Sequence, residues 1–80
     1  MKKYEPLGKY LEGSNKQSVA LTFSDIEKII GDELPVSANQ RQFWENNKNH
    51  GHGQAIAFMG AGYKVIECHL VEKYIVFEKQ

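Results

Sequence analysis

The stretch SVALTFSDIEKIIG, residues 18–31, carries the clearest structural signals in the chain. In residues 18–23 the large apolar side chains of Val19, Leu21 and Phe23 alternate with the small side chains of Ser18, Ala20 and Thr22, which is the period of a half-buried strand. The S-x-x-E pattern from Ser24 to Glu27 then predicts a capping box, in which the serine hydroxyl and the glutamate carboxylate each accept the other residue's backbone N–H. Gly31 supplies the left-handed residue that ends a helix. We therefore expect a strand that runs directly into a short helix.

Two further stretches carry helical signals. Within residues 4–11 the apolar side chains recur at the spacing of one helix face, so a first helix is expected there. Ser37, with Gln40 three residues later, forms a second capping box and predicts another helix over residues 37–45. The side chains that this helix should bury are Phe43 and Trp44.

The last third of the chain predicts a loop, a helix and a hairpin. Residues 46–53 contain no apolar side chain and two glycines, so they should form an exposed loop. Residues 54–61 are apolar on nearly every side, which predicts a helix inside the protein. Residues 63–70 and 74–77 predict the two strands of a hairpin. One face of its first strand should carry Ile66, Cys68 and Leu70.

The expected order is helix, strand, helix, helix, helix and hairpin. Apart from one extra short helix, this is the helix, strand, helix, helix and hairpin order of a winged-helix domain. In such a domain the first strand pairs with the closing hairpin. We therefore expect an α+β, winged-helix-like fold, with three or four short helices packed on a small antiparallel sheet made of one strand plus the C-terminal hairpin. One domain should span residues 1–80. The connector at 31–36 is longer than the three or four residues of an ordinary helix-turn-helix turn.

Charge and size exclude several classes of protein. Ten Lys and Arg balance ten Asp and Glu, so the net charge is zero, and the sequence pI is 6.8. Dedicated nucleic-acid binders commonly have a pI above about 9. Binding to nucleic acid or to an acidic membrane would therefore depend on local patches. Eighty residues also leave no room for a two-domain enzyme.

The cysteine count and the apolar runs indicate a cytoplasmic protein. A single cysteine cannot form an internal disulfide, which fits a reducing compartment. The N-terminal lysines are not followed by the apolar region of a signal peptide. No apolar run approaches the roughly 18 residues needed to span a bilayer. We expect no membrane attachment.

Several short motifs resemble a small bacterial family of unknown function, over nearly the whole chain. The matching runs are Y-x-P-L from Tyr4, L-T-F-x-x-I-E-x-I-I-G from Leu21, L-P-x-S-A from Leu34, W-x-N from Trp44 and A-G-Y from Ala61. The family pattern has tryptophan where this chain has Phe43, Phe58 and Tyr63, so the aromatic character is kept. The resemblance implies a domain found alone or attached to larger proteins, which suggests a recognition role and assigns no activity.

Amide side chains are concentrated in residues 37–54. Asn39, Gln42 and Asn46 would share one polar face of the expected third helix. Amide and guanidinium groups form paired hydrogen bonds with base edges, while lysine and histidine suit phosphates. The expected nucleic-acid-binding residues are Asn39, Arg41, Gln42, Asn46, Lys48, His50 and Lys64, with Lys73 as a further phosphate contact. A solvated helix and a hydrophilic loop without any ligand are the alternative, because such composition is common on protein surfaces.

The chain offers little for metal binding or catalysis. His50, His52 and the pair Cys68 and His69 have suitable ligand atoms. Adjacent strand residues point to opposite faces, so at most three of these could meet, and Cys68 is expected to be a buried small hydrophobe. The Gly60–Gly62 run follows a helix instead of opening one, unlike a phosphate-binding loop. We expect no metal, no cofactor and no enzyme activity.

The expected function is therefore a non-enzymatic recognition domain. Nucleic acid, above all DNA, is the partner expected first, through the amide-rich middle of the chain. The alternative is a protein-interaction module, such as a small phage or plasmid inhibitor that blocks a host protein. A neutral net charge would be no handicap to such a module.

Overall fold

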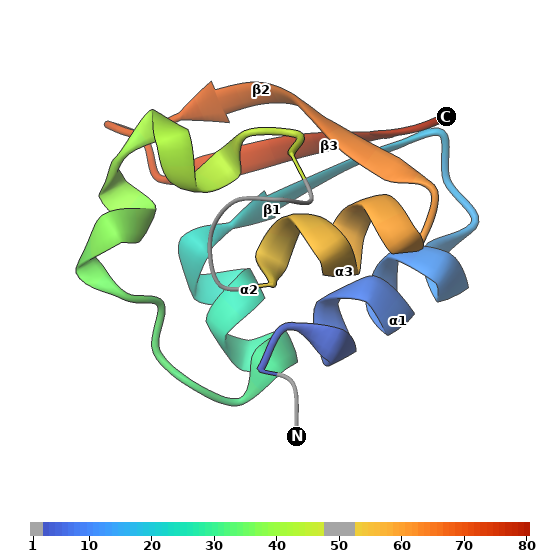
Figure 1. Cartoon of the computed structure of the whole chain (residues 1–80), viewed down its shortest axis with the longest axis horizontal. Helices are drawn as coiled ribbons and strands as arrows, with labels where there is room; N and C mark the ends of the chain where they lie inside the picture. Colours follow the sequence, from blue (N-terminus) through green and yellow to red (C-terminus); the bar gives the residue numbers. More distant parts are fainter. Residues whose placement is uncertain (1–2, 48–52) are drawn as a thin grey trace.

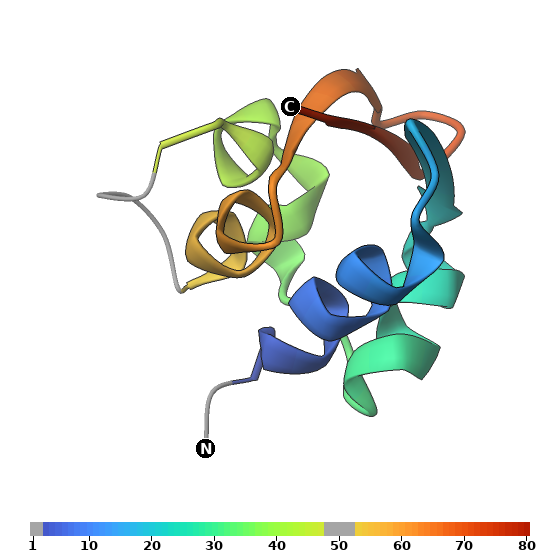
Figure 2. The same cartoon turned by 90° about the vertical axis from the view of Figure 1, so that its right-hand side faces the viewer.

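A three-stranded antiparallel sheet lies against three α-helices (Figure 1). This computed structural model describes residues 3–47 and 53–80. Seen at right angles to the first view, the helices lie beneath one face of the sheet (Figure 2). The elements in chain order are α1 (Glu5–Ser14), β1 (Ser18–Thr22), α2 (Phe23–Ile30), the 3₁₀ helices η1 (Val36–Asn39) and η2 (Arg41–Trp44), α3 (Gln54–Gly60), β2 (Tyr63–His69) and β3 (Tyr74–Lys79).

The strand order β1-β3-β2 confirms the expected pairing of the first strand with the closing hairpin. β1 runs antiparallel to β3, from Ser18 opposite Glu78 to Thr22 opposite Tyr74. β2 and β3 form the C-terminal hairpin. The α+β class and the winged-helix-like order of elements are therefore confirmed.

The capping box of α2 lies two residues earlier than expected. Thr22 is the N-cap: its Oγ1 accepts the N–H of Asp25 at 2.9 Å, and Asp25 Oδ2 accepts the N–H of Thr22 at 3.0 Å. The predicted box from Ser24 to Glu27 is wrong, because the strand already ends at Thr22 and the T-x-x-D pattern supplies the same pair of bonds there. Glu27 instead accepts the N–H of Leu34. Gly31 ends α2 with φ 71°, as predicted.

The expected helix over residues 37–45 is wrong. Two 3₁₀ turns, η1 and η2, are separated by Gln40 in an extended conformation, with φ −112° and ψ 139°. Their buried side chains explain the break. A continuous α-helix advances about 100° per residue, so it would spread Ala38, Phe43 and Trp44 around its axis. The extended residue between the two turns lets all three enter the core.

Aromatic rings from separate elements meet in this core. Tyr4 contacts Phe43 edge-on, with ring centroids 6.1 Å apart. Phe43 packs on Trp44 at 4.8 Å, and Trp44 packs on Phe23 of α2 at 5.6 Å. Such pairs add about 0.5–1.5 kcal/mol each beyond the area they bury. The cluster therefore joins α2 and η2 to the residue that precedes α1.

Helix α3 is less enclosed than its composition predicts. Ala55 and Phe58 are buried, but Ile56 is 52% exposed. On its other side α3 packs tightly against α1 at Gly8, where a Cβ atom would lie 2.8 Å from the carbonyl oxygen of Ala57. The missing side chain lets the two helix backbones approach closely.

Strand β2 contains a bulge that changes which side chains face inward. Val65 lies opposite Phe77, and Glu67 lies opposite Val76, so Ile66 has no partner on β3. Ile66 is 41% exposed, and the expected common face of Ile66, Cys68 and Leu70 is therefore wrong. A bulge shifts the alternation of side chains by one residue. Cys68 is half-buried beside the core and not fully buried as expected.

The contact at Gly8 can be tested with two glycines of the same helix. We expect Gly8→Ala to lower the free energy of unfolding by about 1–3 kcal/mol, because the added methyl group overpacks the contact with α3. Gly13→Ala is the matched control, since nothing lies within 4 Å of its Cβ position. It should be neutral or stabilising by up to about 1 kcal/mol. Chemical denaturation of both variants measures the difference, and equal stabilities would contradict the close packing.

The capping box predicts an acid-sensitive contribution to stability. Hydrogen bonds from Thr22, above all from its backbone N–H, lower the pKa of Asp25 below its ordinary value of 3.8. A lowered pKa in the folded state gives stability that is present above 3.8 and is lost as the pH falls through the folded-state value. Below pH 3.8 the thermal midpoint of the wild type should therefore fall more steeply than that of Asp25→Asn. Parallel curves for the two proteins would show that the carboxylate contributes nothing.

Candidate nucleic-acid interface

The residues expected to bind nucleic acid do not share one helix face. Asn39 ends η1, Arg41 and Gln42 begin η2, and all three are exposed. Lys64 lies on β2, is half-buried and stands opposite Glu78 of β3. Lys48 and His50 fall outside the described residues. What the structure brings together is the trio at positions 39, 41 and 42.

Asn46 has a structural role that its sequence context does not reveal. Its Nδ2 donates to the carbonyl oxygen of Val65 at 2.9 Å, and its Oδ1 accepts the N–H of Val65 at 2.8 Å. The amide thus pairs with the edge of β2 as a neighbouring strand would. Both ends of this side chain are already bonded. The sequence hypothesis of a shared polar face for Asn39, Gln42 and Asn46 is wrong.

Gln54 is a second amide that serves the fold. It is only 2% exposed, and its Nε2 donates to the carbonyl oxygen of Phe43 at 2.8 Å. The indole Nε1 of Trp44 similarly donates to the carbonyl oxygen of Ala38 at 2.9 Å. Both bonds satisfy backbone groups of the irregular segment, which regular secondary structure would otherwise have paired.

A groove lined by both polar and apolar residues lies between the start of α2 and the hairpin turn. Its volume is about 580 Å³, and the polar side chains along it include Ser24, Asn39, Glu72 and Lys73. Lys73 has a left-handed backbone, with φ 60°, and its carbonyl oxygen accepts the N–H of Phe23 at 2.9 Å. This bond ties the hairpin turn to the start of α2. Asn39 and Lys73 therefore line one groove although 34 positions separate them in the chain.

Arg41 lies at the start of η2, two residues after Asn39, and is exposed. In the described parts of the chain, no hydrogen bond or ion pair engages the side chain of Arg41 or of Gln42. Burial raises the pKa of the Cys68 thiol, and the nearby charge of Arg41 acts in the opposite direction. Arg41 thus lies close to the end of β2 that leads into the hairpin turn.

The hairpin also carries negative charge. His69 Nε2 lies 2.7 Å from Glu67 Oε1, and His69 Nδ1 lies 4.0 Å from Glu72 Oε1. The imidazole stacks on the ring of Tyr74, with centroids 4.3 Å apart. Because these carboxylates share the hairpin with Lys73, the local field near the groove is mixed in sign.

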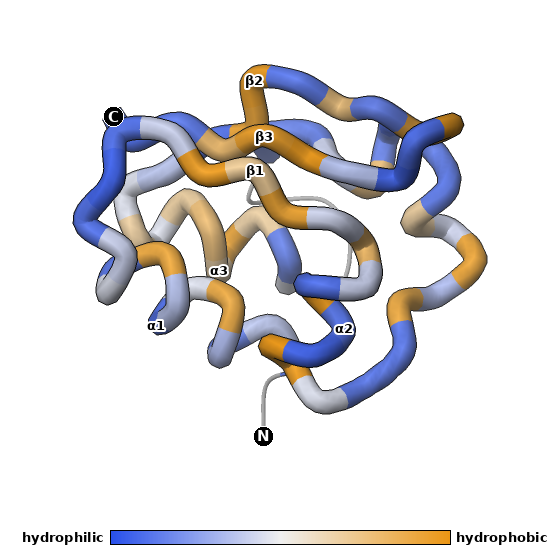
Figure 3. Tube along the Cα trace, turned by 180° about the vertical axis from the view of Figure 1, so that it is seen from behind, coloured by the Kyte–Doolittle hydropathy of each residue, from blue (hydrophilic) through white to orange (hydrophobic). Residues whose placement is uncertain are grey.

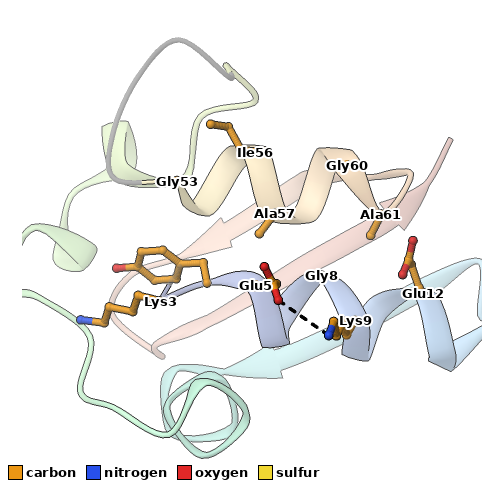
Figure 4. A pocket seen from close by; sticks show the side chains of 11 residues that line it. Lys3, Glu5, Gly8, Lys9, Glu12, Gly53, Ile56, Ala57, Gly60 and Ala61 are labelled. Atoms are coloured by element: carbon orange, nitrogen blue, oxygen red, sulfur yellow. Dashed lines mark ion pairs between the residues drawn. The ribbon is translucent and has the colours of Figure 1, made fainter. Parts of the chain in front are cut away.

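A second groove lies between α1 and α3 and was not predicted from the sequence (Figure 4). Its volume is about 610 Å³. Small residues, among them Gly8, Ala57 and Gly60, form its floor, and the exposed Ile56 stands beside them. The rim carries charges of both signs, including the ion pair of Glu5 with Lys9 at 3.7 Å. The signal that could have revealed it is a glycine at the centre of the first helix.

The described residues hold neither a cluster of metal ligands nor a membrane-spanning helix. Over residues 3–47 and 53–80, no group of three or more His, Cys, Asp or Glu side chains is placed to hold a metal ion. His50 and His52 lie outside these ranges. Among the helices described, none has the length and apolar character required to cross a bilayer.

Comparison with known proteins places the chain in a family. Residues 4–80 match the family model of a domain of unknown function, DUF7662, so the chain belongs to that family. The resemblance to a domain-of-unknown-function family is confirmed at this level. No curated protein and no solved structure matches the chain.

Substitution separates the structural amide from an exposed one. Asn46→Ala should lower the free energy of unfolding by about 1–3 kcal/mol, because two hydrogen bonds to Val65 are lost at about 0.5–1.5 kcal/mol each. Gln42→Ala, which removes an exposed side chain four residues earlier, should change it by less than about 0.5 kcal/mol. Urea denaturation measures both. Equal effects would contradict the role assigned to Asn46.

Proposed function

We propose that the protein is a non-enzymatic recognition domain that binds nucleic acid, with duplex DNA as the first candidate. The observation that carries the proposal is the groove beside the hairpin turn, which brings the polar side chains of Asn39 and Lys73 onto one surface. Arg41 and Gln42 extend this surface with exposed side chains. In this proposal the hairpin turn and η2 contact the nucleic acid, while α3, which is largely apolar, does not.

Each group has a distinct part in the proposed contact. Lys73 and Lys64 suit phosphate oxygens, which fix the position of a protein on nucleic acid. Arg41 can donate two parallel hydrogen bonds to guanine, and Gln42 can pair with adenine. Asn39 already donates one N–H to the carbonyl oxygen of Val36 at 3.2 Å, which leaves its second N–H and its amide oxygen for a base.

The remaining expected residues do not all contact nucleic acid in this proposal. Asn46 is withdrawn from the proposed contacts, because its amide is engaged by Val65. Lys48 and His50 stay in the proposal on their sequence position alone. The carboxylates near Lys73 should keep the affinity modest at physiological salt. The proposed contact therefore depends on a few cations, and its affinity should fall as salt is added, with a slope set by that small number of phosphate contacts.

A protein partner is the second candidate, and the groove between α1 and α3 favours it. Its floor of small residues and the exposed Ile56 present an apolar surface within a rim of mixed charge. A small inhibitor of a host protein could use such a surface without any net charge. The resemblance to a bacterial module found alone or attached to larger proteins fits either candidate.

We also propose a cytoplasmic location, which the lone half-buried cysteine supports.

A salt titration with a matched pair of variants tests the first candidate. Binding of a labelled duplex of about 20 base pairs is followed by fluorescence anisotropy between about 20 mM and about 200 mM salt. Affinity should fall linearly on logarithmic axes for the wild type. Arg41→Ala should weaken binding by about 1–3 kcal/mol, with no change in thermal midpoint. Lys9→Ala removes the same charge from α1 and should bind as the wild type does.

Three results would overturn the assignment. An unfolded Arg41→Ala variant would show that the arginine is structural. Equal losses for Arg41→Ala and Lys9→Ala would show that net charge alone matters. Failure of duplex DNA, single-stranded DNA and RNA to bind at the lowest salt would exclude nucleic acid and leave the protein partner as the candidate to pursue.

A further inference from the structure

The two edge strands of the sheet, β1 and β2, differ in how far their outward backbone groups are protected from pairing with another chain. Along the edge formed by β2, the bulge at Ile66 interrupts the strand, and the Asn46 amide occupies the N–H and carbonyl of Val65. Lys64 and Glu67 also place charges along this strand. Bulges, charges and covering groups are the features by which proteins protect an edge strand from pairing with another chain.

The hydrogen bonds at the two ends of β1 show which of its backbone groups face β3. Lys79 N–H donates to Gln17 O at 2.8 Å, and Phe23 N–H donates to Lys73 O at 2.9 Å. Antiparallel ladders alternate between bonded and non-bonded pairs. Odd-numbered residues of β1 therefore bond to β3, and even-numbered residues direct their N–H and carbonyl groups away from it.

Most of these outward groups are unpaired. Thr22 confirms the outward direction, because its N–H bonds to the Asp25 carboxylate and not to β3. Ser18 and Ala20 each direct one N–H and one carbonyl outward. No hydrogen bond joins these four groups to any residue within 3–47 or 53–80. Two donors and two acceptors thus stand in a row along the edge.

The side chains of β1 do nothing to block this edge. The strand reads SVALT, without charge, proline or bulge. Along β1 Figure 3 shows apolar and intermediate residues only. Ser18 and Ala20 are small and exposed. An edge with these properties can accept another strand at little cost.

We propose that β1 pairs antiparallel with β1 of a second copy of this chain, about a twofold axis at Val19, to give a continuous six-stranded sheet. This register sets Ser18 opposite Ala20 of the second copy, and Ala20 opposite Ser18 of the second copy. Each such pair exchanges both of its bonds, so all four outward groups of each chain find partners. A twofold interface requires such self-complementarity.

Charge favours the same register. It brings Lys16, which is exposed just before β1, to the end of the pair where Asp25 of the second copy caps α2. The twofold axis repeats this approach of opposite charges at the other end. Five residues on each side bury much less than the about 1,200 Å² of a standard interface. The dimer should therefore be weak and dependent on concentration.

Two measurements on the unmodified chain test the pairing. Sedimentation between about 20 µM and about 2 mM should show the mass rising from 9.1 kDa toward twice that value. Over the same range, hydrogen exchange should slow at the amides of Ser18 and Ala20. The amides of Val19 and Leu21, which already bond to β3, should not change. A mass of 9.1 kDa at every concentration, or unprotected Ser18 and Ala20 amides in a dimer, overturns the proposal.

Substitutions at Ala20 identify the surface. In the dimer, position 20 of one copy lies diagonally across from position 20 and from Lys16 of the other copy. Ala20→Lys therefore brings like charges close together, and like charges repel across strands. It should raise the dissociation constant by about tenfold or more. Ala20→Pro removes one outward N–H and should act in the same direction. Val71→Lys adds the same charge at an 89% exposed turn position and should dimerise normally.

The Ala20→Lys variant decides the matter even if the proline variant fails to fold. Circular dichroism establishes that the lysine variant keeps the native secondary structure. A folded Ala20→Lys protein that dimerises as tightly as Val71→Lys would show that the copies meet through another surface. That result would overturn the proposal without bearing on nucleic-acid binding.

Discussion

Side-chain hydrogen bonds that satisfy the backbone of residues 36–47 are the constraint on which the structure depends. This segment lacks an α-helix, and an unpaired buried carbonyl costs about 1–3 kcal/mol. Within the segment, Trp44 donates a hydrogen bond to the carbonyl oxygen of Ala38. Gln54 of α3 donates one to the carbonyl oxygen of Phe43. Asn46 bonds in turn to the edge of β2. The segment is thereby tied to the last helix and to the hairpin at once.

The same constraint sets the outer surface. Adjacent Phe43 and Trp44 both enter the core, which leaves Arg41 and Gln42 of the same short turn exposed. A flexible loop would have to lose conformational entropy to present these groups to a ligand. Here the aromatic contacts and the bonds to neighbouring elements already hold the backbone that carries them.

The sequence is a good guide to this fold where its period is regular and local. Alternation and a C-terminal glycine identify β1 and the end of α2, and the hairpin follows from its strands. The errors share one cause, which is that contacts distant in the chain override local patterns. No local pattern reveals that Asn46 pairs with a strand nineteen residues later. Composition shows that this surface is rich in amides, but it does not show which amides form hydrogen bonds within the fold. Arg41 and Gln42 therefore stay candidates for nucleic-acid binding, while Asn46 does not.

The bulge in β2 gives this hairpin a tolerance for changes in chain length. On either side of Ile66 the pairing with β3 is regular, and the two registers differ by a single position. Removal of that residue would join them into one uninterrupted ladder and leave every other side chain on its present face. Relatives that lack one residue here could thus keep the same core and the same turn, with Ile66 as the position that absorbs the difference.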